Sequence, residues 1–227
     1  MHVHLILPDA EEFPAALADL YGRVADDVLR AALPYSVIAR NDAEQAIALL
    51  GIRFDMVGMK GNKYSVVHYA DTLRNPQQAV LKQGAMRFVC AEPAYTELVL
   101  RAKGEVSARA RMNLDNLRRV LRIQATVDCV AFDDGRFEGV DSRGAFERLE
   151  RERLSEMAFV DEVLGRKSGA RANLETLLAQ ALEAEEIKAL ARRLYEGFEA
   201  GGEAEVATRA RSHRCRIKLI RIGALQI

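Results

Sequence analysis

The sequence predicts an α+β protein: a small mixed or antiparallel sheet with β-hairpins and flanking helices, then a C-terminal amphipathic helical arm and a short basic terminal strand. Short β-prone runs with hairpin signals fill residues 1–141, which we take as an α+β body. Residues 142–206 carry apolar side chains at helical spacing and form the arm. Residues 207–227 alternate basic and apolar side chains, and we expect this basic C-terminal segment to pack on the body or on a partner.

The first 50 residues predict two strands and two helices. Residues 2–7 and 35–39 are short β-prone runs. Residues 9–33 begin with acidic side chains, repeat apolar ones at helical spacing, and end at Pro34, so they predict one long helix. Residues 42–50 follow an Asn-x-x-Glu capping pattern and precede a glycine, which predicts a second helix.

The remainder of the body predicts two hairpins, a strand and two helices. A Gly-Asn turn divides residues 54–69 into one hairpin, and an Asp-Asp-Gly turn divides residues 125–140 into another. Residues 75–84 predict a short helix, residues 86–91 a strand, and residues 107–123 a helix that begins at a serine cap. Three leucines of this last helix should face inward: Leu114, Leu117 and Leu121.

The arm predicts two amphipathic helices. The first covers about residues 146–165, and the second, longer one covers about residues 174–198. Gly201 and Gly202 should break the second helix. Residues 214–219 have the alternation of a basic edge strand.

Charge is segregated along the chain although its formal net value is zero. Residues 51–122 hold thirteen Lys and Arg against six Asp and Glu, and residues 207–227 hold six basic residues and no acid. Opposite charges farther apart than the screening length of about 8–10 Å do not cancel locally. Two such blocks on one surface would attract an anionic polymer.

The leading hypothesis is therefore a non-enzymatic nucleic-acid-binding protein that contacts the phosphates of DNA or RNA with little sequence preference. Single strands are favoured over duplex, because helix-turn-helix and zinc-finger signatures are absent. Aromatic residues interleaved with the cations could stack bases. The candidate contacts are Lys60, Lys63, Arg109, Arg111, Arg118, Arg119, Arg122, Arg214, Arg216 and Lys218.

Two alternatives remain open. In the first, the chain is a self-assembling homo-oligomeric adaptor or scaffold, whose basic blocks dock on the acidic blocks of another copy. In the second, it is an enzyme of unrecognised type. The candidate groups would be His68 and Asp71 as an acid–base pair, and Asp133 and Asp134 as adjacent carboxylates that suit Mg²⁺, although Asp-Asp-Gly is first of all a turn sequence.

No cofactor or metal site is expected from the motifs. The common nucleotide-binding, hydrolase and zinc-protease signatures are absent, and the His2-x-His4 pair lacks the further ligands that a metal needs. Cys90 and Cys129 lie in apolar runs and should be buried, whereas Cys215 lies among cations. Three isolated cysteines, no signal-peptide pattern and no long apolar stretch favour a cytoplasmic protein away from the membrane.

Overall fold

The computed structural model describes residues 2–22, 27–71, 81–101, 106–165, 187–212 and 220–221. The chain forms two compact units, one over Met1–Arg143 and one over Gly144–Arg221. Helices and antiparallel sheets are both present, so the predicted α+β class is confirmed. In the described part of the chain, no helix has the length and apolar character that crossing a membrane requires.

A three-stranded antiparallel sheet opens the first unit. It consists of β1 (Val3–Ile6), β2 (Ser36–Asn41) and β5 (Met86–Cys90), in the order β1-β2-β5. Helices α1 (Phe13–Tyr21) and α3 (Pro93–Arg101) contact this sheet through β5 and contact each other. The predicted strands at 2–7, 35–39 and 86–91 are confirmed.

The single helix predicted over 9–33 is wrong. The structure has three pieces: α1, α2 (Asp27–Arg30) and the 3-10 turn η1 (Leu33–Tyr35). Helix α1 ends at Gly22, whose φ of 65° is the left-handed conformation that glycine adopts at helix C-termini. Apolar residues at helical spacing continue past Gly22 in the sequence, and for that reason a single long helix was predicted.

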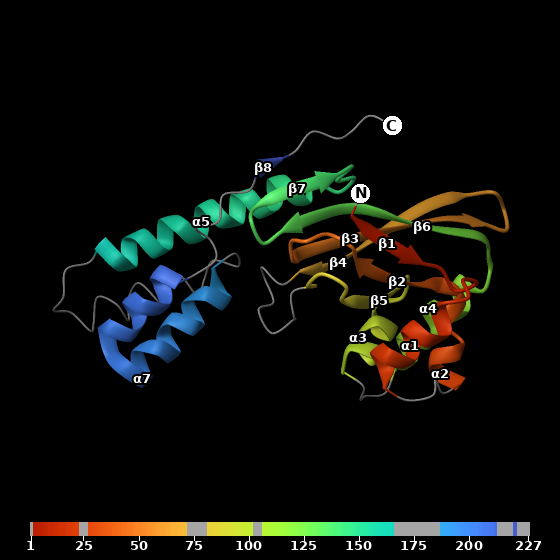
Figure 1. Cartoon of the computed structure of the whole chain (residues 1–227), viewed down its shortest axis with the longest axis horizontal. Coiled ribbons are helices and arrows are strands. Elements are labelled where there is room, and N and C mark those ends of the chain that lie inside the picture. Colours follow the sequence, from red (N-terminus) through yellow and green to blue (C-terminus); the bar gives the residue numbers. More distant parts are fainter. Residues whose placement is uncertain are drawn as a thin grey trace. The chain divides into compact units, whose positions relative to one another are not determined.

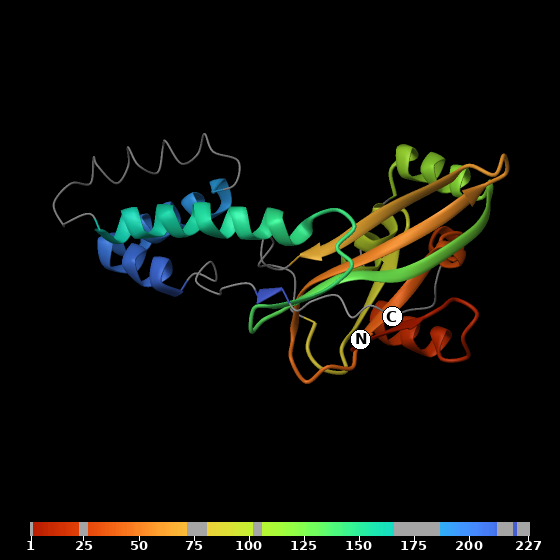
Figure 2. The ribbon, with the colours of Figure 1, turned by 90° about the horizontal axis from the view of Figure 1, so that it is seen from above.

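The second sheet of this unit has longer strands and contains both of the predicted hairpins (Figures 1 and 2). Its strands run antiparallel in the order β4-β3-β6-β7. Their bounds are β3 (Ile47–Gly58), β4 (Lys63–Asp71), β6 (Val120–Phe132) and β7 (Arg136–Gly139). Both predicted hairpins are thereby confirmed.

The helix predicted over 42–50 is also wrong, because β3 begins at Ile47. Asn41 stabilises a turn here instead of capping a helix. Its side-chain amide donates to the carbonyls of Gln45 and Leu81, each at 2.8 Å, and its side-chain oxygen accepts from the Ala43 N–H at 2.9 Å. Asparagine side chains offer turns and helix caps the same kind of bond, so the sequence pattern did not distinguish them.

Helix α4 (Ala108–Leu117) begins where predicted, since the Ser107 hydroxyl accepts from the Ala110 N–H at 3.2 Å. It ends earlier than predicted, and the chain enters β6 at Val120. Leu114 and Leu117 are buried, as predicted. Leu121 is 67% exposed, so the prediction that it faces inward is wrong. The register between β3 and β6 shifts at this point, and Leu121 is the residue left without a pairing partner on β3.

One apolar core joins both sheets and the helices of the first unit. Phe88 comes from the three-stranded sheet, Ile52 and Phe54 from the longer one, and Phe13 and Leu114 from helices. Along β3, Ile52, Phe54 and Met56 are buried while the residues between them are partly exposed. One face of the long sheet is therefore the core face, and the other is the outer face.

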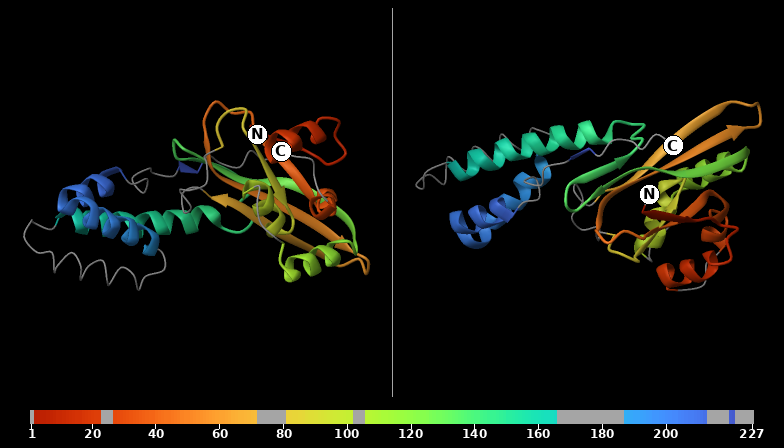
Figure 3. Two further views of the ribbon diagram at one scale, coloured as in Figure 1. Left: turned by 90° about the horizontal axis from the view of Figure 1, so that it is seen from below. Right: turned by 45° about the horizontal axis from the view of Figure 1, so that its top comes forward.

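The second unit is a helical pair with its own core. Helices α5 (Ala145–Gly165) and α7 (Lys188–Ser212) contact each other, as Figure 3 also shows, and strand β8 (Ile220–Arg221) follows them. The core contains Val160, Leu190 and Leu194 among others. The predicted break at Gly201–Gly202 is confirmed, with Gly202 at a φ of 66°. The predicted elements at 75–84 and 214–219 lie wholly or mostly outside the described residues, as do residues 174–186 of the helix predicted over 174–198, whose remaining part lies within α7.

Candidate functional site

Five of the candidate cations lie at one end of the long sheet. Val57 of β3 pairs with Lys63 of β4 on one side and with Arg122 of β6 on the other. Directly opposed residues point to the same face, so Lys63 and Arg122 share the outer face with Val57. Two strand spacings separate their backbones, which is about 10 Å.

The neighbouring turns add three more cations to this end. Lys60 lies in the β3–β4 turn, which is closed by hydrogen bonds from Gly58 N–H to Asn62 and from Gly61 N–H to Gly58. Gly58 pairs with Val120, so the Arg118-Arg119 turn that enters β6 lies beside the hairpin (Figure 2). We call this group the cationic end; it consists of Lys60, Lys63, Arg118, Arg119 and Arg122.

All five side chains of the cationic end are exposed. Arg118 forms an ion pair with Asp115 at 3.2 Å. None of the other four forms an ion pair with a described residue. The cationic end therefore presents several solvated positive charges, of which Arg118 forms an ion pair with Asp115, and such an arrangement concentrates anions near it.

The other predicted contacts are not part of this group. Arg109 and Arg111 are exposed in the first half of α4, up to about 13 Å along the helix from Arg118. The predicted contacts of the C-terminal segment lie outside the described residues: Arg214, Arg216 and Lys218. The structure thus brings together half of the predicted set.

The aromatic residues that were expected to stack bases are mostly structural. Phe54, Phe88 and Tyr95 are fully buried in the core of the first unit, and Tyr69 is partly buried. Tyr64, at 40% exposure, is the open ring of this set, but it pairs with the buried Met56 and so points to the opposite face of the sheet from Lys63. Charge, more than stacking, is what this surface offers a ligand.

The first candidate acid–base pair does not form. His68 and Asp71 are three residues apart on β4, so their side chains point to opposite faces of the sheet. The His68 Nε2–H donates to the Ala91 carbonyl at 2.8 Å, and the ring stacks edge-on against Phe54 at 5.9 Å. Burial lowers the pKa of His68, which favours the neutral ring in this structural contact.

The two adjacent aspartates at the β6–β7 turn form local contacts that support the strands and the turn. Asp134 accepts from the Arg136 backbone N–H at 3.0 Å and from its guanidinium Nε at 2.8 Å. The Asp133 N–H donates to the Ala46 carbonyl at 2.9 Å. The Asp134 contacts are those of an Asp-Asp-Gly hairpin turn, and the Asp133 bond joins the end of β6 to the residue before β3.

Neither the N-terminal histidines nor the described cysteines add a candidate residue to the cationic end. His4 Nε2 lies 3.1 Å from a Glu12 carboxylate oxygen, in an exposed contact. Cys90 is buried, as predicted, and burial raises the pKa of its thiol to about 12. Cys129 is buried as well.

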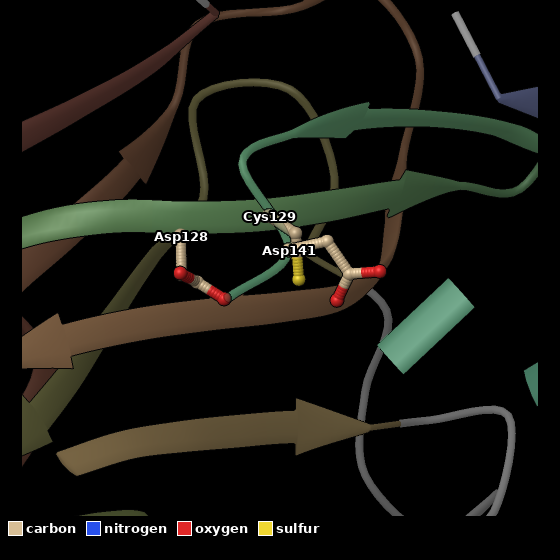
Figure 4. Close-up of side chains that lie close together, drawn as sticks. All are labelled: Asp128, Cys129 and Asp141. Carbon is tan, nitrogen blue, oxygen red and sulfur yellow. The ribbon is translucent and has the colours of Figure 1, made fainter. Parts of the chain in front are cut away.

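A second constellation involves Asp128, Cys129 and Asp141, whose ligand atoms all lie within 4.8 Å of one another. Figure 4 shows the Cys129 thiol between the two carboxylates. All three residues are buried, with exposed fractions of 2%, 0% and 7%. Within the described residues this is the one group of three or more such side chains close enough to share a metal ion.

A β-bulge creates this cluster. Gly51 pairs with Cys129 and Ile52 pairs with Val127, so Asp128 is an extra residue on β6. Neighbouring side chains on a regular strand point to opposite faces, and a bulge re-aims one of them. Asp141 follows β7 at a φ of 56°, and its N–H donates to the Asp128 carbonyl at 3.1 Å.

These three residues were not predicted from the sequence as a group. The available signal was an aspartate inside the otherwise apolar run of 125–132. The bulge and the return of Asp141 depend on pairing between strands, and neither follows from local pattern.

Comparisons of the chain with protein-family models, with curated proteins and with solved structures find no match. The function therefore has to be argued from the cationic end and the buried cluster themselves.

Proposed function

We propose that this chain is a nucleic-acid-binding protein that contacts phosphates through its cationic end. The observation that carries the proposal is the row formed by Lys63, Val57 and Arg122. It joins residues that are far apart in the sequence on the outer face of one sheet. Lysine offers a phosphate a compact charge, and arginine offers it two parallel hydrogen bonds.

The chemistry of this surface favours binding with little sequence preference. Its cations reach out from turns and a strand end, and phosphate contacts carry no base information. The preference for single strands rests on the absence of helix-turn-helix and zinc-finger signatures, because Tyr64 points to the opposite face of the sheet from Lys63. Affinity should then be governed by counterion release and fall steeply with salt.

The direct test is a salt titration of binding by the full-length chain. Fluorescence anisotropy would follow a labelled thirty-nucleotide poly-dT strand, with RNA and duplex DNA of the same length as comparisons. Binding at low salt that weakens linearly in log–log form is the expected result. No measurable affinity for any of the three probes at low salt would refute the proposal.

Charge-matched variants locate the contact. Lys63→Gln/Arg122→Gln removes two charges from the cationic end, and Arg30→Gln/Lys82→Gln removes two exposed charges from other parts of the first unit. If both residues contact phosphates, the first variant lowers the salt slope by about 1.4, since each single-strand contact contributes about 0.7. An equal loss in both variants would mean that net charge, not this surface, governs binding.

A further inference from the structure

We propose that Asp128, Cys129 and Asp141 bind one zinc ion, a site that is separate from the proposed nucleic-acid contact. The cluster is not an acidic surface patch: a thiol and two carboxylates converge from β6 and from the segment after β7, and all three are buried. A divalent cation bound among them would stabilise the negative charge of the buried carboxylates and thiolate.

The donor set selects the metal. Magnesium and calcium prefer shells made of oxygen alone, whereas a thiolate is a ligand for softer ions. Zinc accepts cysteine sulfur and aspartate oxygen together in tetrahedral sites. Three protein ligands leave a fourth position for water or for another ligand.

The distances between the three ligand atoms match those of a zinc site once the atoms move slightly closer together. Bonds of about 2.0–2.3 Å in a tetrahedron place neighbouring ligand atoms about 3.3–3.8 Å apart. The three atoms of this cluster are already within 4.8 Å of one another. Each pair therefore closes by no more than about 1.5 Å, a movement that rotation of the two aspartate side chains supplies.

The surrounding backbone holds the ligands in place. The Ser142 N–H donates to both carboxylate oxygens of Asp128, each at 3.2 Å, which orients that group from outside the cluster. Gly139 pairs with Cys129 and allows β7 to approach so closely that a Cβ there would lie 2.7 Å from the Cys129 Cα. Outer contacts of this kind fix the orientation of metal ligands.

Binding replaces the thiol proton with the metal. The sulfur–hydrogen bond breaks, the sulfur–zinc bond forms with the electron pair kept on sulfur, and the proton passes to solvent. No oxidant or reductant is needed.

The test uses the full-length chain after treatment with a chelator. Cobalt(II) is titrated in, because a cobalt–thiolate bond gives a charge-transfer absorption that histidine and carboxylate ligands do not give. We expect this band to saturate at one cobalt per chain and to disappear when one equivalent of zinc is added. Absence of the band at saturating cobalt would overturn the proposal.

Variants identify the ligands. Cys129→Ser should abolish the band, whereas Cys90→Ser, which changes a buried thiol on β5, should retain it. Asp141→Asn should weaken cobalt binding at least tenfold. A band that survives in Cys129→Ser would place the metal elsewhere and refute the assignment.

A measurement on the unaltered chain covers the case in which a variant does not fold. Zinc should raise the urea midpoint of unfolding of the chelator-treated chain, because a ligand that binds only the folded state stabilises it. An equal midpoint with and without saturating zinc would contradict the proposal.

Discussion

Gly139→Ala should destabilise the first unit strongly, because this glycine meets two independent restrictions. Its φ is +114°, a region that side-chain-bearing residues rarely adopt, and holding alanine there costs about 1–3 kcal/mol. An added Cβ would also lie 2.4 Å from the Asp128 carbonyl oxygen. That neighbour is backbone, so no rotation of a side chain relieves the contact.

Relief of the contact requires β7 to move away from β6, which adds about 1–3 kcal/mol as other overpacked sites do. The total loss is then about 2–6 kcal/mol, a large share of the about 5–15 kcal/mol that stabilises a typical domain. Urea denaturation followed by far-ultraviolet circular dichroism measures this loss as a lower midpoint. Amide hydrogen exchange in β6 and β7 localises it.

Gly61→Ala is the matched control. Gly61 also has a positive φ, 75°, but a Cβ there would meet nothing within 4 Å. It should cost only the left-handed penalty of about 1–2 kcal/mol. If Gly139→Ala proves no more destabilising than Gly61→Ala, the close approach of β7 to β6 is not the constraint that we infer.

Three further outcomes follow from particular contacts. Ser107→Ala should lower the free energy of unfolding by about 1 kcal/mol, because it removes the cap of α4; a midpoint in urea equal to that of the wild type would contradict this role. Burial lowers the pKa of His68 below its ordinary 6.5, so its contribution to stability is complete above pH 6.5 and is lost as the pH falls below it; His68→Gln should flatten this part of the curve of stability against pH. Cys90, with a thiol pKa of about 12, should resist alkylation at pH 8 in the folded chain and react once urea unfolds it, as peptide mass spectrometry would show.

Local signals were sufficient for much of the fold. The Gly-Asn and Asp-Asp-Gly turns, the serine cap and the Gly201–Gly202 break all act within a few residues of themselves, and each prediction is confirmed. The errors arose where one local pattern has two physical uses. Asn41 with Glu44 matches a capping box, yet Asn41 uses the same side-chain groups to hold a turn before β3.

The two candidate sites differ in how much of each could be predicted from the local sequence. The abundance of cations between residues 51 and 122 is visible in the sequence, and it pointed to Lys60, Lys63 and the arginines around Arg122. Their convergence is set by the register of β4, β3 and β6, which is a long-range property. The buried cluster depends wholly on that register, because a shift of one residue at Asp128 places its carboxylate near Cys129.

The two proposed sites lie on one strand, so their independence is itself testable. Arg122 and Asp128 are six residues apart on β6, which corresponds to about 20 Å of extended chain. Groups more than about 7–10 Å apart with no shared partner contribute additively, within about 0.5 kcal/mol. Asp141→Asn should therefore change the affinity for poly-dT by no more than about twofold. Lys63→Gln/Arg122→Gln should likewise leave the cobalt–thiolate band intact. A larger effect in either direction would mean that β6 couples the two sites, and metal binding would then have to be treated as part of nucleic-acid recognition.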